Sequence, residues 1–410
     1  MAKLASWGKS KVAAGPVNGH RSSVFDSLIF RAPFVLCTLV LVTGCKHEFG
    51  RQSAAPVTTQ LALDRYNYVI GTQTIGASYQ FTPAPRLVET ASRIRELGAH
   101  VIKFSITPSG SPNNQSLAEV AEKDAVVRQV LDMPFSQVIL WALPQATRNS
   151  LFENRTLPIE YQQIYDLTIF LRTTYKGSRR EFYLGNWEGD WELTHVGTHE
   201  PNANDVEAMI EWARTRQRAV DDAKRSTPDS DVGVFYYIEV NRVHDAQVGK
   251  TRVSNAVLPM ANPDFVSYSS YDALDDQSMQ QLRSSLDYLQ SKLSAKAGLP
   301  ERRVFIGEFG FPASHYTPEQ QDELSKQVML AGLAWGCRFV LYWEFYNNEV
   351  EKGIQKGFWM VDDKGIKQPI YFSLENYYRS ANAFVRDFGE THHRLPLERE
   401  FDNAAKTWLR

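Results

Sequence analysis

The sequence predicts a (β/α)8 barrel, the α/β fold in which eight parallel strands alternate with eight helices. Eight short apolar or aromatic runs alternate with longer segments of helical periodicity. No glycine-rich phosphate loop follows the first run, which counts against the rival doubly wound open sheet. The predicted strands begin at Tyr68, His100, Gln137, Glu181, Val232, Asp264, Arg303 and Arg338.

The segments between these runs carry helix start signals. Asn204, with Glu207 three residues later, resembles a capping box, and Thr317 precedes a proline at a first helical position. Because the alternation continues without an internal linker, we expect one domain over residues 67–410. Further helices are expected over residues 84–97, 116–131, 158–175, 277–296 and 369–388.

Composition describes an enzyme-sized globular chain. Its 410 residues are 43% hydrophobic, which is enough to bury a sizeable core. The formal net charge is only -2, so the chain lacks the strong positive charge that recruits nucleic acid. We therefore expect no nucleic-acid partner.

The N-terminal region has the pattern of a targeting signal. Basic residues precede an apolar run over residues 32–42, which is too short to span a bilayer comfortably. The tetrapeptide VTGC at residues 42–45 resembles a bacterial lipobox, in which cleavage precedes a cysteine that then receives lipid. We expect residues 1–44 to be a lipoprotein signal peptide and residues 45–66 a flexible tether. Lipid on Cys45 would then hold the protein to a membrane of the cell envelope, facing the periplasm or the exterior.

The remaining cysteines fit this expectation. Cys37 would leave with the signal peptide, so only Cys337 remains in the folded domain and no intramolecular disulfide is expected. An ordinary signal peptide, or a short anchor with a chance cysteine, is the alternative interpretation of the same segment.

Two predicted strands end in acids where packing alone would favour apolar residues. The segments are FYLGNWEGDWEL (182–193) and RVFIGEFGFP (303–312), and burying charge is costly. Strand alternation places Glu188 on one face with residues 182 and 184, and Glu308 with residues 304 and 306. We expect this face to point into the barrel, with both acids at its C-terminal opening, where barrel active sites lie.

Two converging carboxyl groups have a clear chemical use. Cleavage of a glycosidic bond requires one carboxyl group to protonate the leaving oxygen and another to attack the sugar. At a separation of about 5 Å, the charge of one raises the pKa of the other. Nearby aromatic rings would stack on sugar faces. The aromatic side chains expected to contact substrate are Trp187, Trp191, Tyr268, Tyr271 and Trp343.

These segments resemble the (β/α)8 retaining glycoside hydrolases of clan A over about residues 68–388. The resemblance rests on IGEFGFP, LGNWEGDW, the YW pair at 342–343 and the closing segment 357–378. It implies that Glu308 is the nucleophile, Glu188 the acid/base and Trp343 the floor of the subsite for the cleaved sugar. It also implies a carbohydrate substrate and no cofactor.

One departure from the clan pattern concerns the asparagine that usually precedes the acid directly. Here Trp187 separates Asn186 from Glu188, so the usual hydrogen bond from the asparagine to the sugar 2-hydroxyl is not assured. Glu192, and more weakly Asp190, are the reserve candidates for the acid.

Other charged side chains have two interpretations each. Glu239 either binds a sugar hydroxyl or pairs with Arg242. Lys103 either orients the nucleophile or is a buried lysine matched with a neighbouring acid. Glu344 is expected to form a salt bridge under the barrel helices, and a catalytic role is the alternative.

Only one of Tyr268 and Tyr271 can face inward from a regular strand.

Two alternatives to a glycosidase remain open at this stage. The shifted asparagine favours a carbohydrate-binding barrel on the cell envelope that has lost catalysis, which would bind glycans without cleaving them. A metal-dependent hydrolase would use His195 and His199, four residues apart, and would lose activity with a chelator. Gly197 between them favours a loop, so no metal is expected.

Overall fold

The computed structural model describes residues 69–106, 115–144, 156–195, 197, 199–274 and 278–410. The predicted signal peptide, Cys45 and the tether lie outside these residues. Within the described part of the chain, no helix combines the length and apolarity that crossing a membrane requires.

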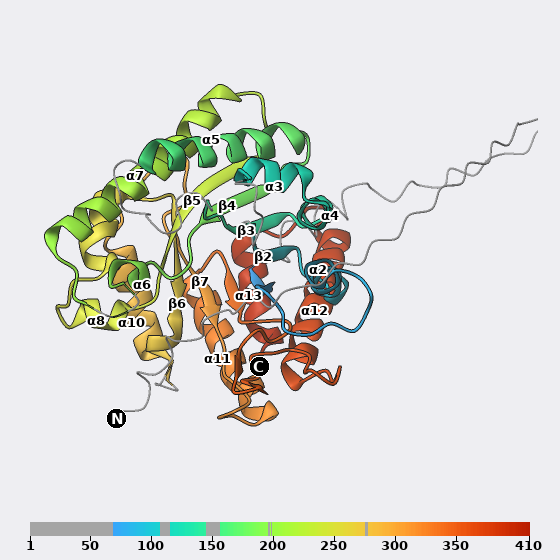
Figure 1. Ribbon diagram of the computed structural model, residues 1–410. Coiled ribbons are helices and arrows are strands. Elements are labelled where there is room, and N and C mark those ends of the chain that lie inside the picture. Colours follow the sequence, from blue (N-terminus) through green and yellow to red (C-terminus); the bar gives the residue numbers. More distant parts are fainter. Residues whose placement is uncertain (1–68, 107–114, 145–155, 196, 198, 275–277) are drawn as a thin grey trace, which may run out of the picture. The chain divides into compact units, whose positions relative to one another are not determined.

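Eight parallel strands close into a barrel in the order in which they occur along the chain, which confirms the predicted fold. Each strand pairs with the next, and β8 pairs with β1. Figure 1 shows helices arranged around these strands. The strands are β1 (Ile70–Thr74), β2 (Val101–Ser105), β3 (Gln137–Trp141), β4 (Glu181–Gly185), β5 (Gly233–Val240), β6 (Phe265–Ser269), β7 (Val304–Phe309) and β8 (Val340–Tyr342).

The expected helices are present, together with a C-terminal helix and several short elements that the sequence pattern did not predict. The larger helices are α2 (Arg86–Leu97), α3 (Leu117–Lys123), α4 (Ala125–Asp132), α5 (Leu157–Thr174), α7 (Ala203–Ser226), α10 (Gln280–Gln290), α11 (Pro318–Trp335), α12 (Pro369–His392) and α13 (Glu398–Trp408). The shorter elements are α6 (Gly189–Leu193), α8 (Val243–Gln247), η2 (Val253–Val257), α9 (Leu258–Ala261), η3 (Ser270–Ala273) and the β9 (Val350–Glu351) and β10 (Ile354–Gln355) hairpin.

Capping side chains mark the starts of several helices, and two of the helix predictions need correction. The helix expected over residues 116–131 is divided, because the Asp124 side chain accepts hydrogen bonds from two backbone amides and begins α4. Helix α7 is capped by Asn202 with Asp205, not by Asn204 with Glu207. Thr317 caps α11 as predicted.

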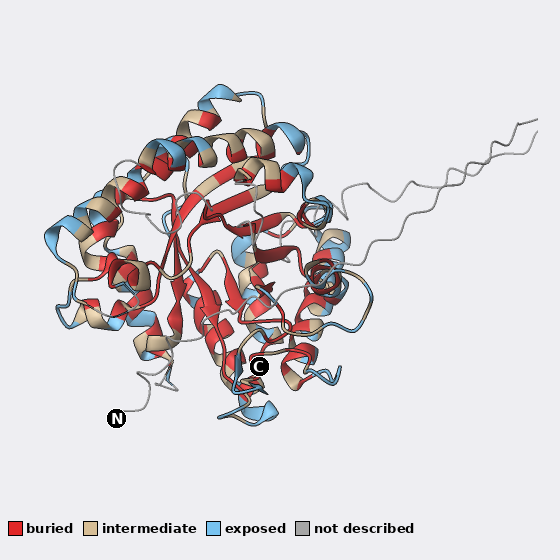
Figure 2. Ribbon diagram, in the orientation of Figure 1, coloured by how far each residue is buried: buried red, intermediate tan, exposed pale blue. Residues whose placement is uncertain are grey.

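The faces of the strands are opposite to those predicted from alternation. Residues 182, 184, 304 and 306 pack in the core between the barrel and its helices, so the expectation that they point into the barrel was wrong. Both faces of the strands are buried (Figure 2), and a strand that is apolar on both sides gives no signal for which side is inside. The barrel interior is filled by Val101, Ile139, Tyr183, Tyr237, Phe265, Phe305, Phe339 and Leu341.

Local irregularities bring the two acids to the barrel opening despite this reversal. The register of β7 against β8 shifts between Ile306 and Phe309, and such an irregularity re-aims the side chains that follow it. The Glu308 carboxylate thereby reaches an inward lysine. Strand β4 ends at Gly185, and Glu188 lies beyond it, immediately before α6. Alternation therefore does not apply to Glu188.

Candidate active site

A polar layer replaces the apolar filling at the C-terminal end of the barrel. Ser267 Oγ donates a hydrogen bond to Glu239 Oε2 at 2.8 Å, and Gln73 Nε2 donates to the Gly307 carbonyl at 3.2 Å. All three side chains are buried. A Cβ atom at Gly307 would lie 1.8 Å from Ser267 Oγ, so only glycine fits there. This layer forms the floor beneath the two predicted catalytic acids.

Lys103 is the centre of this layer. Its Nζ lies 2.8 Å from Glu239 Oε2 and 2.8 Å from Glu308 Oε1, and all three side chains are almost entirely buried. Burial lowers the pKa of Lys103, but the charges of Glu239 and Glu308 outweigh it and raise the pKa above its ordinary value. Lys103 is therefore both a buried lysine paired with an acid and a residue that fixes the predicted nucleophile.

Glu239 has a different partner from the one considered in the sequence. It pairs with Lys103, whereas Arg242 pairs with Asp245 at 2.6 Å. The other oxygen of Glu239, Oε1, accepts a hydrogen bond from the backbone amide of Glu188 at 3.2 Å. Glu239 thus links Lys103, and through it Glu308, to the backbone of the predicted acid/base.

The two predicted catalytic acids differ in how strongly they hold a proton. Burial raises the pKa of Glu188 far above its ordinary value, and the charges of Glu308 and Glu239 raise it further. Burial also raises the pKa of Glu308, to about 8, although the Lys103 charge opposes this rise. The rise is therefore larger for Glu188. Glu188 therefore holds its proton more strongly, and Glu308 is the first of the two acids to ionise as pH increases.

Aromatic rings stand beside this cluster. The Trp343 ring lies 6.1 Å from that of Trp141, with the planes tilted by 35°, and Lys103 Nζ lies 4.8 Å from the Trp141 ring. Trp187 and Tyr271 are half-buried against the same inner group. Trp141 was missed in the sequence, although its alternation with Ile139 on β3 places both on one face.

The two tyrosines lie on different elements, because Tyr268 is on β6 whereas Tyr271 lies beyond the strand, in η3. Because Ser267 points inward, its neighbour Tyr268 points outward, where it is fully buried and donates a hydrogen bond to Asp272 Oδ1. Burial followed by the charge of Glu308 raises the pKa of Tyr271. The structure therefore places Tyr271, and not Tyr268, beside the glutamates.

Asn186 and Trp191 support the acid/base segment in different ways. Asn186 is buried; its Nδ2 donates to the Trp187 carbonyl at 3.0 Å, and its Oδ1 accepts from the Glu239 amide at 3.3 Å. A hydrogen bond from the Trp191 side chain lowers the pKa of Glu188 against the effect of burial, and the Arg242 guanidinium lies 5.0 Å from the Trp191 ring. Sugar contacts of Asn186 and Trp191 stay predictions.

Asp190 is a structural residue, which removes it as a reserve acid. It is fully buried, and its carboxylate accepts hydrogen bonds from the backbone amides of Asn241, Arg242 and Val253 at 2.8–3.1 Å. These contacts join the segment after β4 to the segment after β5. Glu192 is half-buried on the same short helix, α6.

Replacing Asp190→Asn is expected to lower the free energy of unfolding by about 1–3 kcal/mol, because the amide NH2 would face a backbone N–H and leave it unsatisfied. Urea unfolding at neutral pH measures this loss. The matched control is Asp229→Asn at an exposed turn, where the expected change is within about 0.5 kcal/mol. Equal stability of the two variants would contradict the structural role of Asp190.

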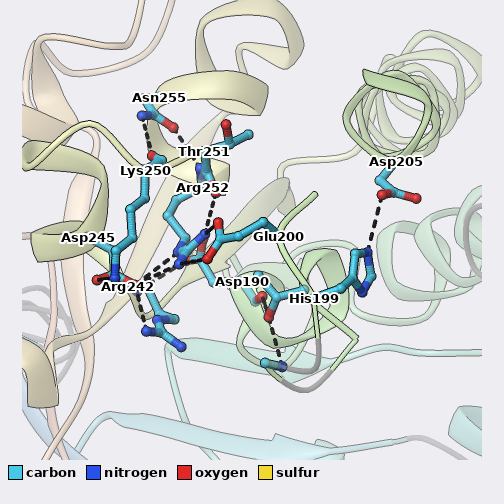
Figure 3. Close-up of polar contacts among 12 residues, drawn as sticks. Asp190, His199, Glu200, Asp205, Arg242, Asp245, Lys250, Thr251, Arg252 and Asn255 are labelled. Atoms are coloured by element: carbon cyan, nitrogen blue, oxygen red, sulfur yellow. Dashed lines mark hydrogen bonds and ion pairs between the residues drawn. The ribbon is translucent and has the colours of Figure 1, made fainter. Parts of the chain in front are cut away.

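A network of ion pairs reinforces the same segments. Figure 3 shows Arg252 between Glu200 and Asp245, with contacts of 2.7 Å and 2.8 Å. Arg252 is buried, so this network fixes the segment after β5 against the one before α7.

The two histidines lie in a loop, as predicted, and not on a helix. Their rings meet edge to face at 4.2 Å, between the ends of α6 and α7. With Asp205 they form a group whose possible ligand atoms lie within 4.8 Å of one another. Asp205 Oδ2 already accepts hydrogen bonds from the Asn202 amide and from His199 Nε2, the latter visible in Figure 3.

Glu344 does not form the expected salt bridge within the described part of the chain. Its side chain is fully buried, and its Oε2 accepts a hydrogen bond from the Ile75 amide at 2.8 Å. Burial raises the pKa of Glu344 far above its ordinary value, and the nearby charge of Glu349 raises it further. Glu349, on the loop after β8, was not singled out in the sequence.

Comparisons with known proteins support the fold. No family model matches this chain, and no curated protein matches it. Among solved structures, a family 39 glycoside hydrolase from Bacteroides cellulosilyticus WH2 is similar with a TM-score of 0.50 and 12% identity, over 76% of this chain and 64% of that one. The β-glycosidase BGL167 has a TM-score of 0.50 and 15% identity, over 77% of this chain and 96% of that one. This chain thus covers less than two thirds of the Bacteroides enzyme. At these identities the likeness concerns the barrel fold.

Proposed function

We propose that this chain is a retaining glycoside hydrolase acting on an oligo- or polysaccharide. The observation that carries the proposal is the charge arrangement at the barrel opening. Lys103 Nζ lies 2.8 Å from Glu308 Oε1 and favours its ionised form, while Glu188, whose pKa is raised further, holds its proton more strongly. An anionic nucleophile beside a protonated acid is the starting state that double displacement requires.

In the first step, Glu308 attacks the anomeric carbon and forms a glycosyl ester with it. The bond to the leaving oxygen breaks at the same time, and the Glu188 proton passes to that oxygen. Trp343 provides an apolar surface under the sugar ring, as the clan resemblance implies. Lys103 favours the ionised form of Glu308, which is the form that attacks.

In the second step, Glu188 is an anion and accepts a proton from water. The resulting hydroxide equivalent attacks the anomeric carbon, the ester bond breaks, and Glu308 leaves as carboxylate. Two inversions return the original anomeric configuration. We also propose that lipid on Cys45 attaches the enzyme to a membrane of the cell envelope, a proposal supported by the N-terminal sequence alone.

The substitution Glu188→Gln tests the acid/base assignment. We expect kcat/KM to fall by about 10²–10⁴-fold for glycosides with alkyl leaving groups, because these need the proton. Nitrophenyl glycosides need less protonation, so the first step on them should be slowed much less. The basic limb of the pH profile should also disappear, since its origin is ionisation of Glu188.

Glu192→Gln is the matched control, because Glu192 was the other reserve acid. A large leaving-group effect in Glu192→Gln, with none in Glu188→Gln, would reassign the acid. Binding of glycans without cleavage of any would support the carbohydrate-binding alternative. Loss of activity with a chelator would support a metal-dependent hydrolase.

A further inference from the structure

Glu349 is held at the barrel opening by two side-chain contacts. Its Oε1 accepts a hydrogen bond from Trp343 Nε1 at 3.2 Å, and its Oε2 lies 3.0 Å from Lys356 Nζ. The Lys356 amide also donates to the Glu349 carbonyl at 2.9 Å, at the base of the β9–β10 hairpin. The carboxylate is therefore fixed beside the predicted floor of the subsite.

The electrostatic influence of Glu349 reaches the reacting groups. Its charge contributes, after burial and other neighbours, to the raised pKa values of Glu308 and Tyr271. Five carboxyl groups gather at this opening, and the lysines that pair with them there are already engaged. Lys103 bridges two glutamates, and Lys356 pairs with Glu349. The carboxyl groups are Glu188, Glu239, Glu308, Glu344 and Glu349.

We propose that Glu349 determines the specificity of this subsite, admitting uncharged sugars and excluding sugars that carry a carboxylate. The inference rests on the proposed glycosidase function. A uronic acid bound on Trp343 would bring a second carboxylate beside that of Glu349, which accepts the hydrogen bond from Trp343 Nε1. It would reach Lys356 only by displacing Glu349, which also holds the Trp343 indole.

Matched aryl glycosides test the proposal in the unmodified enzyme. Glucosides and glucuronides differ only at C6, as do galactosides and galacturonides, and both anomers of each are compared. We expect kcat/KM to be at least about 100-fold lower for each uronide, the effect of a like charge about 6 Å away at an effective dielectric constant of 20.

Two substitutions locate the origin of this discrimination. Glu349→Gln keeps an acceptor for Trp343 Nε1 but releases Lys356 from its ion pair. We expect the ratio of neutral to uronide kcat/KM to narrow by at least about tenfold. Adding Lys356→Met to this variant should restore the ratio, because the cation that attracts the uronide is then gone. Glu351→Gln, an exposed charge on the same hairpin, should leave the ratio unchanged.

The outcomes separate the two proposals. Uronides cleaved as fast as their neutral partners, or an unchanged ratio in Glu349→Gln, would overturn the specificity inference while the glycosidase function stands. Absence of cleavage of every glycoside, neutral or charged, would overturn both.

Discussion

Glu308→Gln is expected to lower kcat for aryl glycosides by on the order of 10⁴-fold or more. The amide has nearly the shape of the carboxyl group but cannot form the glycosyl ester, so the first step has no nucleophile. Steady-state hydrolysis of a nitrophenyl glycoside measures the loss. Circular dichroism should show an unchanged fold, because Lys103 keeps its pair with Glu239.

A second variant, with a smaller side chain at residue 308, tests specifically whether Glu308 is the nucleophile, because an added anion can take its place. In Glu308→Ala, added azide should restore cleavage and give a glycosyl azide of inverted configuration, since only one displacement then occurs. Full activity of Glu308→Gln would refute the assignment of the nucleophile. A glycosyl azide of retained configuration would show that another group is the nucleophile and that Glu308 acts as the acid/base.

Lys103→Met is expected to lower the free energy of unfolding by about 3–5 kcal/mol, the usual cost of leaving buried charge without its partner. Both Glu239 and Glu308 would lose the cation that lies 2.8 Å from each. Urea unfolding measures the change. The matched control is Lys123→Met, which breaks an exposed pair with Glu119 and should cost at most about 0.5 kcal/mol.

The loss of stability in Lys103→Met should depend on pH in a direction that follows from the pKa of Glu308. The Lys103 charge opposes the rise that burial causes in the pKa of Glu308, so its removal raises that pKa further. A buried carboxyl whose pKa is raised binds protons more readily than in the unfolded chain, so stability falls as pH increases from the ordinary value to the raised one. Because the pKa of Glu308 in the unmodified protein is already about 8, the extra loss in the variant should appear as pH increases above about 8 and should be smaller at pH 7.

The pH dependence of activity should shift in the same direction. Because attack requires ionised Glu308, the acid limb of kcat/KM in Lys103→Met should move to higher pH. A variant that lost stability without this shift would show that Lys103 supports the fold but does not keep the nucleophile ionised.

Much of this arrangement was predictable from local patterns. Apolar runs alternating with helical segments predicted the barrel, because strand and helix periodicities are local properties of the chain. The acids at Glu188 and Glu308 were detectable because an acid at the end of an apolar run is costly without a use. The loop around His195 and His199 followed from Gly197.

The pattern did not determine which strand face is inside. A barrel strand is covered by helices on one side and by other strands' side chains on the other, so both faces read as apolar. The alternation argument thus sent residues 304 and 306 to the wrong side, and it reached Glu308 correctly only because β7 is irregular there.

Contacts between residues that are distant in the sequence could not be predicted from local patterns either. Local patterns in the chain were enough to predict the barrel and the two acids that follow apolar runs. The contacts of Lys103 with Glu239 and Glu308, of Asp190 with backbone amides, and of Glu349 with Trp343 became visible only in the folded chain. The physical reason is that ion pairs and hydrogen bonds depend on distances between strands and loops, which periodicity along one chain does not encode.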